Sequence, residues 1–235
     1  MGDVGISVGT SRSGSRWPAR IGVLLVLVLA SALSYAVFER ATSEDLSRCQ
    51  RFALESKERQ VIVTGAGRRI VVIGDSYSAG LGLDDPARSW PRELTGEVHV
   101  FGFSGSGFGE DASPCGRVSY DDRAARATRG GADLVVLQGG LNDVFSSEAQ
   151  LRDGVRRVLE RLHALHVVVV GPVPAPRRMP GATKVDTVLA QECERAGVDY
   201  ISMIDLPLDY LEGDLHLTQA GHRAFGAAVA TALTE

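Results

Sequence analysis

Five short apolar runs between residues 69 and 204 constrain the fold more than any other feature of the chain. Each has the length of a strand and is rich in apolar residues, mostly Val and Ile, as strands buried on both faces are. The runs are RIVVIG at 69–74, VHVF at 98–101, DLVVLQ at 133–138, VVVVG at 167–171 and VDYISMI at 198–204. Helical patterns lie between or after them, the clearest at 147–163, 183–196 and 218–233. This alternation predicts a three-layer α/β/α domain of flavodoxin-like type, with a five-stranded parallel sheet, over residues 69–235.

Residues that can carry chemistry follow four of these runs. Ser76 follows the first run, Gly105 the second, Asn142 the third, and Asp214 and His216 the fifth. Ligands of such sheets bind at the carboxyl ends of the strands, where the loops emerge together. These residues, far apart in sequence, are therefore expected to converge at one edge of the sheet.

A serine, a histidine and an aspartate are the groups that acyl transfer through a serine ester requires. Ser76 is the expected nucleophile, because it lies where a strand turns into a helix. His216 is the expected general base, and Asp214, two residues before it, is the carboxylate expected to orient the imidazole. Asp205 and Asp209 are alternative carboxylates.

Three hydrogen-bond donors can form an oxyanion hole beside this nucleophile. The backbone N–H of Ser76 is free at a helix N-terminus, Gly105 lets a second backbone N–H approach closely, and Asn142 offers a side-chain amide. Each residue also has an ordinary structural interpretation, as a helix cap for Ser76 and Asn142 and as a flexible turn for Gly105. The glycines around Gly105 lack the full G-x-G-x-x-G spacing, which argues against a dinucleotide loop.

Taken together, these motifs resemble the four blocks of the SGNH (GDSL-type) hydrolase family over residues 69–235. The matching segments are Gly74-Asp75-Ser76, Gly105, Gly140-Leu141-Asn142-Asp143 and Asp214-Leu215-His216. The last has one intervening residue fewer than the family's D-x-x-H pattern, and Tyr77 replaces the usual leucine.

The resemblance implies an esterase that works without metal or cofactor. Ser76, His216 and Asp214 would be catalytic, and Ser76, Gly105 and Asn142 would form the oxyanion hole. No long apolar lid is evident, which favours short acyl or O-acetyl groups on a small-molecule, glycan or lipid ester. An O-acyltransferase using the same site and a non-catalytic envelope-binding module are the alternatives. Arg177 and Arg178 are either a contact for an anionic group or a solvated charge pair.

The N-terminal part of the chain predicts a membrane or export signal. Residues 1–20 form a basic tail, and residues 21–38 are an uncharged, mostly apolar run that spans roughly 27 Å as a helix, close to the hydrocarbon thickness of a bilayer. A single-pass signal anchor with a cytoplasmic N-terminus is favoured over a cleaved signal peptide or a buried core helix. Residues 39–68 would be a juxtamembrane linker, of which residues 39–59 are either a helix or a linker, and residues 69–235 would lie outside the cytoplasm, either anchored or secreted.

Export permits a disulfide, and three cysteines leave one thiol over. Cys115 follows the second predicted strand, whereas Cys193 lies late in a helix that runs back to the opposite edge. Cys49 precedes the first strand, so the expected pair is Cys49 with Cys193. The net charge of −4 gives no indication of nucleic-acid binding.

Overall fold

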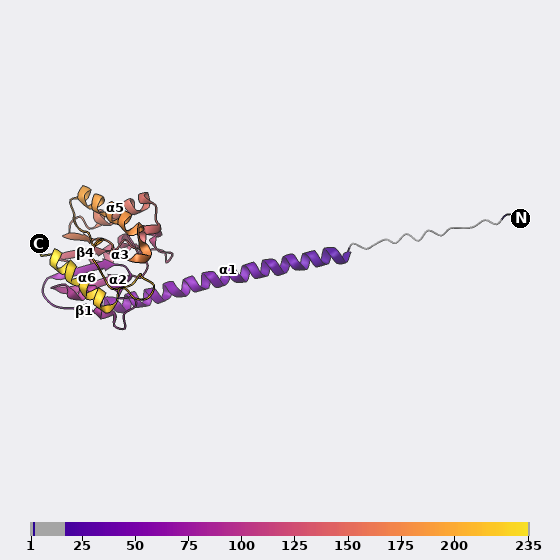
Figure 1. Ribbon diagram of the computed structural model, residues 1–235, viewed down its shortest axis with the longest axis horizontal. Helices are drawn as coiled ribbons and strands as arrows, with labels where there is room; N and C mark the ends of the chain where they lie inside the picture. Colours follow the sequence, from indigo (N-terminus) through magenta and orange to yellow (C-terminus); the bar gives the residue numbers. More distant parts are fainter. Residues whose placement is uncertain (1, 3–16, 235) are drawn as a thin grey trace. The chain divides into compact units, whose positions relative to one another are not determined.

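The computed structural model describes residue 2 and residues 17–234, except that the side chains of residues 17–26 and 36–46 are not described. The chain divides into two compact units, Met1–Asp45 and Leu46–Glu235. Helix α1, Trp17–Gln60, begins in the first unit and ends in the second. The second unit contains all the other helices and strands among the described residues (Figure 1).

The predicted anchor at residues 21–38 lies only partly within the described side chains, which here are residues 27–35. Over the part of the chain that the structure describes, no helix meets both the length and the hydropathy needed to cross a membrane.

The sheet of the second unit has the predicted parallel strands and one strand more. Its order is β1-β3-β2-β4-β5-β6, with β1 antiparallel to β3 and every other neighbouring pair parallel. The bounds are β1 Val63–Thr64, β2 Arg69–Gly74, β3 Glu97–Gly102, β4 Leu134–Gln138, β5 Val167–Val170 and β6 Asp199–Ile201. The five parallel strands have the 2-1-3-4-5 order of flavodoxin-like sheets, so the predicted fold class is confirmed.

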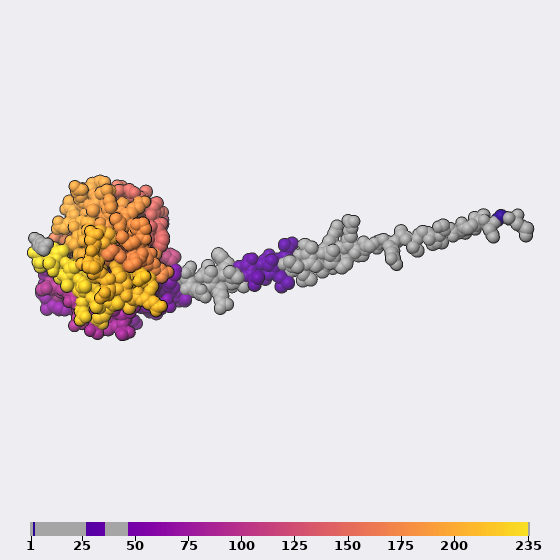
Figure 2. All heavy atoms as spheres, in the orientation of Figure 1, coloured from indigo at the N-terminus to yellow at the C-terminus, as the bar shows by residue number. Residues whose placement is uncertain are grey.

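Both faces of this sheet are covered, which explains the continuous apolar runs. In β2, Ile70 and Val72 face one core, whereas Val71 and Ile73 face the other. The first core contains residues of α2, η2 and α6, and the second contains residues of α3, α4 and α5. The bounds of these elements are α2 Ser76–Ala79, η2 Trp90–Glu93, α3 Tyr120–Ala127, α4 Glu148–Arg161, α5 Gly181–Ala196 and α6 Gln219–Ala232. Figure 2 shows a closely packed surface of the second unit, formed largely by C-terminal residues coloured orange to yellow.

Strand register places the loops that carry the candidate residues at one level. Gly74 at the end of β2 pairs with Gly102 of β3 and with Gln138 of β4. Gln138 pairs with Val170 at the end of β5. The loops after these strands therefore leave the sheet side by side, at an edge that we call the carboxyl edge.

The last turns of α1 are part of the second unit and pack at the carboxyl end of β3, although the sequence placed residues 39–68 in a juxtamembrane segment outside the domain. The hydroxyl of Ser56 donates a hydrogen bond of 2.6 Å to the carbonyl of Gly102, at the carboxyl end of β3. The ring of Phe52 contacts that of Phe103 edge-on, with centroids 6.5 Å apart. The compact unit consequently begins at Leu46 rather than at residue 69.

The predicted disulfide between Cys49 and Cys193 is wrong. Cys49 bonds to Cys115, with Cα atoms 5.3 Å apart, and Cys193 is a buried free thiol in α5. The error came from placing Cys49 beside the start of the first strand. Because α1 continues from Cys49 to Gln60, it carries the chain over roughly 16 Å, so Cys49 lies at the carboxyl edge with Cys115.

Candidate active site

Ser76 is the first residue of α2, directly after β2. The N-cap of this helix is Asp75, whose buried carboxylate accepts a hydrogen bond of 2.9 Å from the backbone N–H of Tyr77. The Ser76 hydroxyl is therefore not used for capping, which was the ordinary structural interpretation of this serine. Burial raises the pKa of Asp75 to about 7, with a smaller upward contribution from the neighbouring Asp143.

His216 lies within hydrogen-bond distance of Ser76, as the sequence predicted for this pair. Its Nε2 atom is 3.2 Å from the Ser76 hydroxyl oxygen. With the ring proton on Nδ1, Nε2 accepts the hydroxyl proton, which is the arrangement that general-base activation requires. Burial lowers the pKa of His216, and the positive charges of Arg178 and Arg177 lower it further, which favours the neutral imidazole that a general base requires.

Two contacts position the loop that carries His216. The hydroxyl of Tyr77 donates to the carbonyl of Leu215, the residue before the histidine. The backbone N–H of Leu211 donates to the carbonyl of His216 at 2.7 Å. Tyr77, which stands where the related family has leucine, thus ties α2 directly to the loop that carries His216.

The expected oxyanion-hole residues line the same cavity as Ser76 and His216. This catalytic cavity has a volume of about 350 Å³, and Gly105 and Asn142 are among its lining residues. Gly105 has a φ of 79°, a left-handed conformation that favours glycine. The Asn142 amide donates to the carbonyl of Ser106 at 2.9 Å, which fixes its orientation and uses one of its two N–H donors. Its side chain does not cap the following short helix, η4 (Asp143–Phe145).

The carboxylate of Asp214 does not join this pair in the structure. Asp214 is exposed and has a left-handed backbone with φ of 55°. Among the described residues, no hydrogen bond or ion pair links its side chain to His216 or to any other group. Asp205 and Asp209 are also exposed.

Arg123 of α3 is a buried residue beneath the site that the sequence did not indicate. One of its guanidinium nitrogens donates to the carbonyl of Gly74 at 3.1 Å and to the hydroxyl of Ser106 at 2.8 Å, and another donates to the carbonyl of Phe101. It therefore joins the ends of β2 and β3 to the glycine loop. Burial lowers its pKa to about 10, so it remains charged at neutral pH.

Asp143 holds the other side of the glycine loop. Its buried carboxylate accepts hydrogen bonds from the backbone N–H groups of Phe108 at 3.2 Å and Gly109 at 2.7 Å. Burial raises its pKa to about 7. Among the described residues, no cluster of three or more His, Cys, Asp or Glu side chains is arranged to hold a metal ion.

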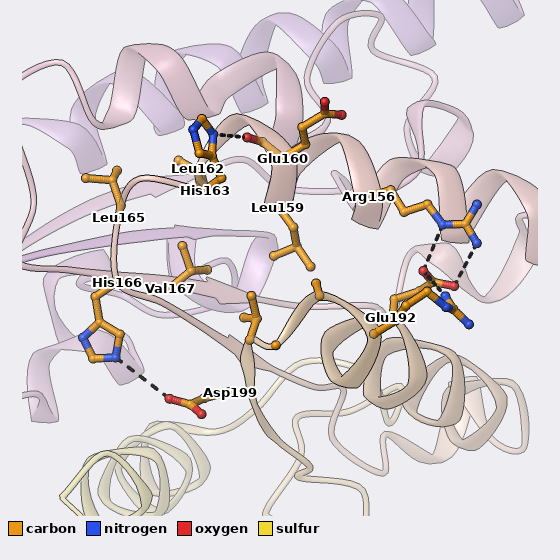
Figure 3. Close-up of a pocket in the computed structure, with 14 residues that line it drawn as sticks. Arg156, Leu159, Glu160, Leu162, His163, Leu165, His166, Val167, Glu192 and Asp199 are labelled. Carbon is orange, nitrogen blue, oxygen red and sulfur yellow. Dashed lines mark hydrogen bonds and ion pairs between the residues drawn. The ribbon is translucent and has the colours of Figure 1, made fainter.

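A second cavity, of about 550 Å³, lies at the opposite edge of the sheet, where β5 and β6 begin (Figure 3). We call it the amino-edge cavity. The buried carboxylate of Glu192 is bound there by Arg156 at 3.0 Å and by Arg195, and outside the lining by Arg152 at 2.7 Å. Burial alone would raise the pKa of Glu192, but hydrogen bonds from these arginines lower it to about 2.

Comparisons with known proteins establish the family of the chain. Residues 72–224 match the GDSL-like Lipase/Acylhydrolase family, so the chain belongs to that family and is a carboxylic ester hydrolase. No protein of curated function matches the sequence.

Solved structures share the fold at low sequence identity. The carbohydrate acetylesterase Est24 from Sinorhizobium meliloti superposes with a TM-score of 0.59 and 17% identity, covering 72% of this chain and 99% of its own. An aryl esterase from M. smegmatis gives a TM-score of 0.60 and 20% identity over the same shares of the two chains. A putative arylesterase from Agrobacterium tumefaciens gives a TM-score of 0.58 and 19% identity, covering 72% of this chain and 99% of its own. The SGNH hydrolase fold implied by the sequence motifs is thereby confirmed.

Proposed function

We propose that this protein is an extracytoplasmic serine esterase that removes short acyl groups, such as O-acetyl, by a Ser-His-Asp mechanism. The observation that carries the proposal is the 3.2 Å contact between the Ser76 hydroxyl and His216 Nε2, in a cavity that Gly105 and Asn142 also line. A nucleophile, a base and oxyanion donors around one space are the groups that ester hydrolysis uses.

In the proposed reaction, His216 takes the hydroxyl proton as Ser76 attacks the ester carbonyl. The negative charge that develops on the carbonyl oxygen is stabilised by the backbone N–H groups of Ser76 and Gly105 and by the Asn142 amide. The alcohol leaves with the proton from His216, and the acyl group remains on Ser76. Water then attacks this ester as His216 takes its proton, and Ser76 leaves with that proton as the acid is released.

Asp214 is proposed to orient the imidazole by accepting a hydrogen bond from Nδ1. It lies two residues before His216, and within the described part of the chain no other group binds its carboxylate. Catalytic hydrogen bonds of this kind often form only when substrate is bound.

The size of the catalytic cavity supports a short acyl group. Its volume of about 350 Å³ is near the lower end of the roughly 300–1,000 Å³ range of small-molecule sites. The rings of Phe52 and Phe145 and the side chains of Leu81 and Leu141 are part of its lining. Two of the structurally similar proteins carry names that refer to acetyl and aryl esters.

The proposed location, with the catalytic unit outside the cytoplasm, has two supports. One is the uncharged run at residues 21–38, preceded by arginines but by no acidic residue after Asp3, which fits a single-pass anchor or an export signal. The other is the Cys49–Cys115 disulfide, because disulfides persist in oxidising compartments.

The test is hydrolysis of p-nitrophenyl esters, from acetate to octanoate, by the full chain in detergent and by its Ser76→Ala variant. We expect the variant to lose at least about 1,000-fold in kcat/KM while keeping the wild-type circular dichroism spectrum. A fluorophosphonate probe should label the wild-type protein at Ser76, as located by peptide mass spectrometry. Full activity in Ser76→Ala, or labelling at another serine, would refute the proposal.

A further inference from the structure

The charges around the catalytic cavity are all of one sign. Its lining, as far as the structure describes it, contains two arginines, Arg48 and Arg178, and no Asp or Glu. Positive charge in a cleft with low-dielectric walls attracts anions and concentrates them there. Neutral esters such as simple alkyl acetates do not need such a charge.

Arg178 lies closest to this chemistry. It ends the short helix η5, Pro176–Arg178, which follows β5 at the carboxyl edge, and its backbone N–H donates to the carbonyl of Ala175 at 2.8 Å. Its guanidinium lies over the ring of Phe145, with Cζ 4.7 Å from the ring centroid. This stacking uses the face of the planar group and holds it in place, so the ring does not occupy the terminal N–H groups at its edge.

The guanidinium of Arg178 donates no hydrogen bond to any group that the structure describes. Its Nε is buried without a hydrogen-bond partner, and among the described residues no carboxylate forms an ion pair with it. A buried donor without a partner is costly, whereas a guanidinium fork binds a carboxylate or phosphate with two parallel hydrogen bonds. The charge of Arg178 also acts on His216, where it is the largest electrostatic contribution after burial.

From these observations we infer that Arg178 is a specificity residue for esters that carry an anionic group close to the reacting carbonyl, on either the acyl or the alcohol side. The inference rests on the proposed esterase function and adds a substrate class to it. The stacked guanidinium of Arg178 binds the anion, and Arg48 adds positive charge to the same cavity.

The experiment compares each anionic ester with its neutral methyl ester. For the alcohol side the pair is para-acetoxybenzoate and methyl para-acetoxybenzoate; for the acyl side it is mono-p-nitrophenyl glutarate and its methyl ester. The readout is the ratio of kcat/KM, anionic over neutral, for the full chain at low ionic strength. A ratio of about ten or more in one pair is expected, and which pair shows it identifies the side that carries the charge.

Arg178→Gln should bring this ratio to about one, and Arg178→Lys should retain part of it, since lysine keeps the charge but lacks the fork. Arg178 also lowers the pKa of His216, so its substitution changes the rates of both esters through the histidine. The ratio of the two rates cancels this common change. Arg177→Gln is the matched control: Arg177 is exposed and outside the lining of the cavity, and its variant should keep the wild-type ratio.

Ratios at or below one for both pairs in the wild-type protein, or a preference that survives Arg178→Gln, would overturn the inference. In either case, hydrolysis of the neutral esters would leave the esterase proposal standing. If the protein hydrolyses none of the four esters, the proposed function is refuted, and the inference with it.

Discussion

The two cavities at opposite edges of the sheet are both lined by arginine, but they use it differently. In the amino-edge cavity, the buried carboxylate of Glu192 neutralises a cluster of arginines (Figure 3). In the catalytic cavity, Arg178 has only an aromatic ring beneath it and no carboxylate among the described residues. The amino-edge cavity is also the larger, at about 550 against about 350 Å³.

The difference shows that satisfied hydrogen bonds, rather than cavity size, distinguish a structural site from a reactive one. Polar groups that have partners within the protein stabilise the fold, whereas groups without them are available to a ligand. Substitutions at the catalytic cavity should therefore change activity more than stability, and substitutions at Glu192 should do the reverse.

The largest effect in this comparison is expected for Asn142→Ala. Loss of an oxyanion donor should lower kcat about 100- to 1,000-fold with p-nitrophenyl acetate, at little cost in melting temperature. Gln191→Ala removes an amide that accepts a hydrogen bond of 2.7 Å from Arg152 beside the amino-edge cavity, and it should keep wild-type kinetics. If kcat falls less than threefold in Asn142→Ala, the assignment of the Asn142 amide to the oxyanion hole is refuted.

Asp214→Asn should have an intermediate effect. A buried triad aspartate contributes about 10,000-fold to the rate, but an exposed carboxylate is screened by water and should contribute about 10- to 100-fold. Asp199→Asn, an exposed aspartate 3.9 Å from His166 at the other edge, is the control and should leave kcat/KM unchanged. Equal activity of the two variants would show that Ser76 and His216 work without Asp214.

Glu192→Gln should leave kcat/KM unchanged and lower the free energy of unfolding by about 2 kcal/mol at pH 7. Removing one partner of a fully buried ion pair costs roughly 3–5 kcal/mol, and the expected loss is smaller because the arginines retain contact with water. Urea denaturation of the wild-type protein and of Glu192→Gln measures this difference in the free energy of unfolding.

The same pair of proteins gives a pH test. The pKa of Glu192, about 2 in the folded protein, lies below its ordinary value of 4.5. Its contribution is therefore complete above pH 4.5 and is lost as the pH falls toward 2. The stability difference between wild type and Glu192→Gln should shrink over this interval. A difference that stays constant, or a loss of esterase activity in the variant, would contradict the structural role of Glu192.

The smallest effect concerns the pH profile. Burial and two arginines lower the pKa of His216, so the acid limb of kcat/KM for a neutral ester should lie below pH 6.5, the ordinary pKa of histidine. Arg177→Gln removes one of those charges and should move the limb upward, less so at high salt. Arg195→Gln, at the amino-edge cavity, should not move it. An unchanged limb in Arg177→Gln would mean that the charge of Arg177 does not contribute to the pKa of His216.

The sequence predicted those parts of the molecule that local patterns encode. Val- and Ile-rich runs predicted the parallel strands, and the rule that loops meet at the carboxyl edge predicted that Ser76 and His216 lie together. A helix was one of the two alternatives for residues 39–59, but its packing was not predicted, because its charged residues have the composition of a solvent-exposed segment, although Phe52 and Ser56 pack at the carboxyl end of β3. The Cys49–Cys193 error followed from that omission.

Arg123 escaped prediction for a different reason. Apart from the Ser106 hydroxyl, its partners are backbone carbonyls, including those of Gly74 and Phe101, and backbone atoms leave no trace in residue type. A local capping box of Ser119 and Asp122 marks the start of α3, but nothing local shows which side of that helix meets the strand ends. The approach of a helix to strand ends is a property of the folded chain alone.

The disulfide has a topological consequence for the site. The bond between Cys49 and Cys115 closes a loop with a sequence separation of 66, and both Ser76 and Gly105 lie within it. Closing a loop of that length restricts the unfolded chain by about 4 kcal/mol in the chain-entropy description. A protease that cuts once inside this ring separates no piece from the molecule: Ser76 and Gly105 stay covalently joined to the rest of the chain, including the segment that carries His216.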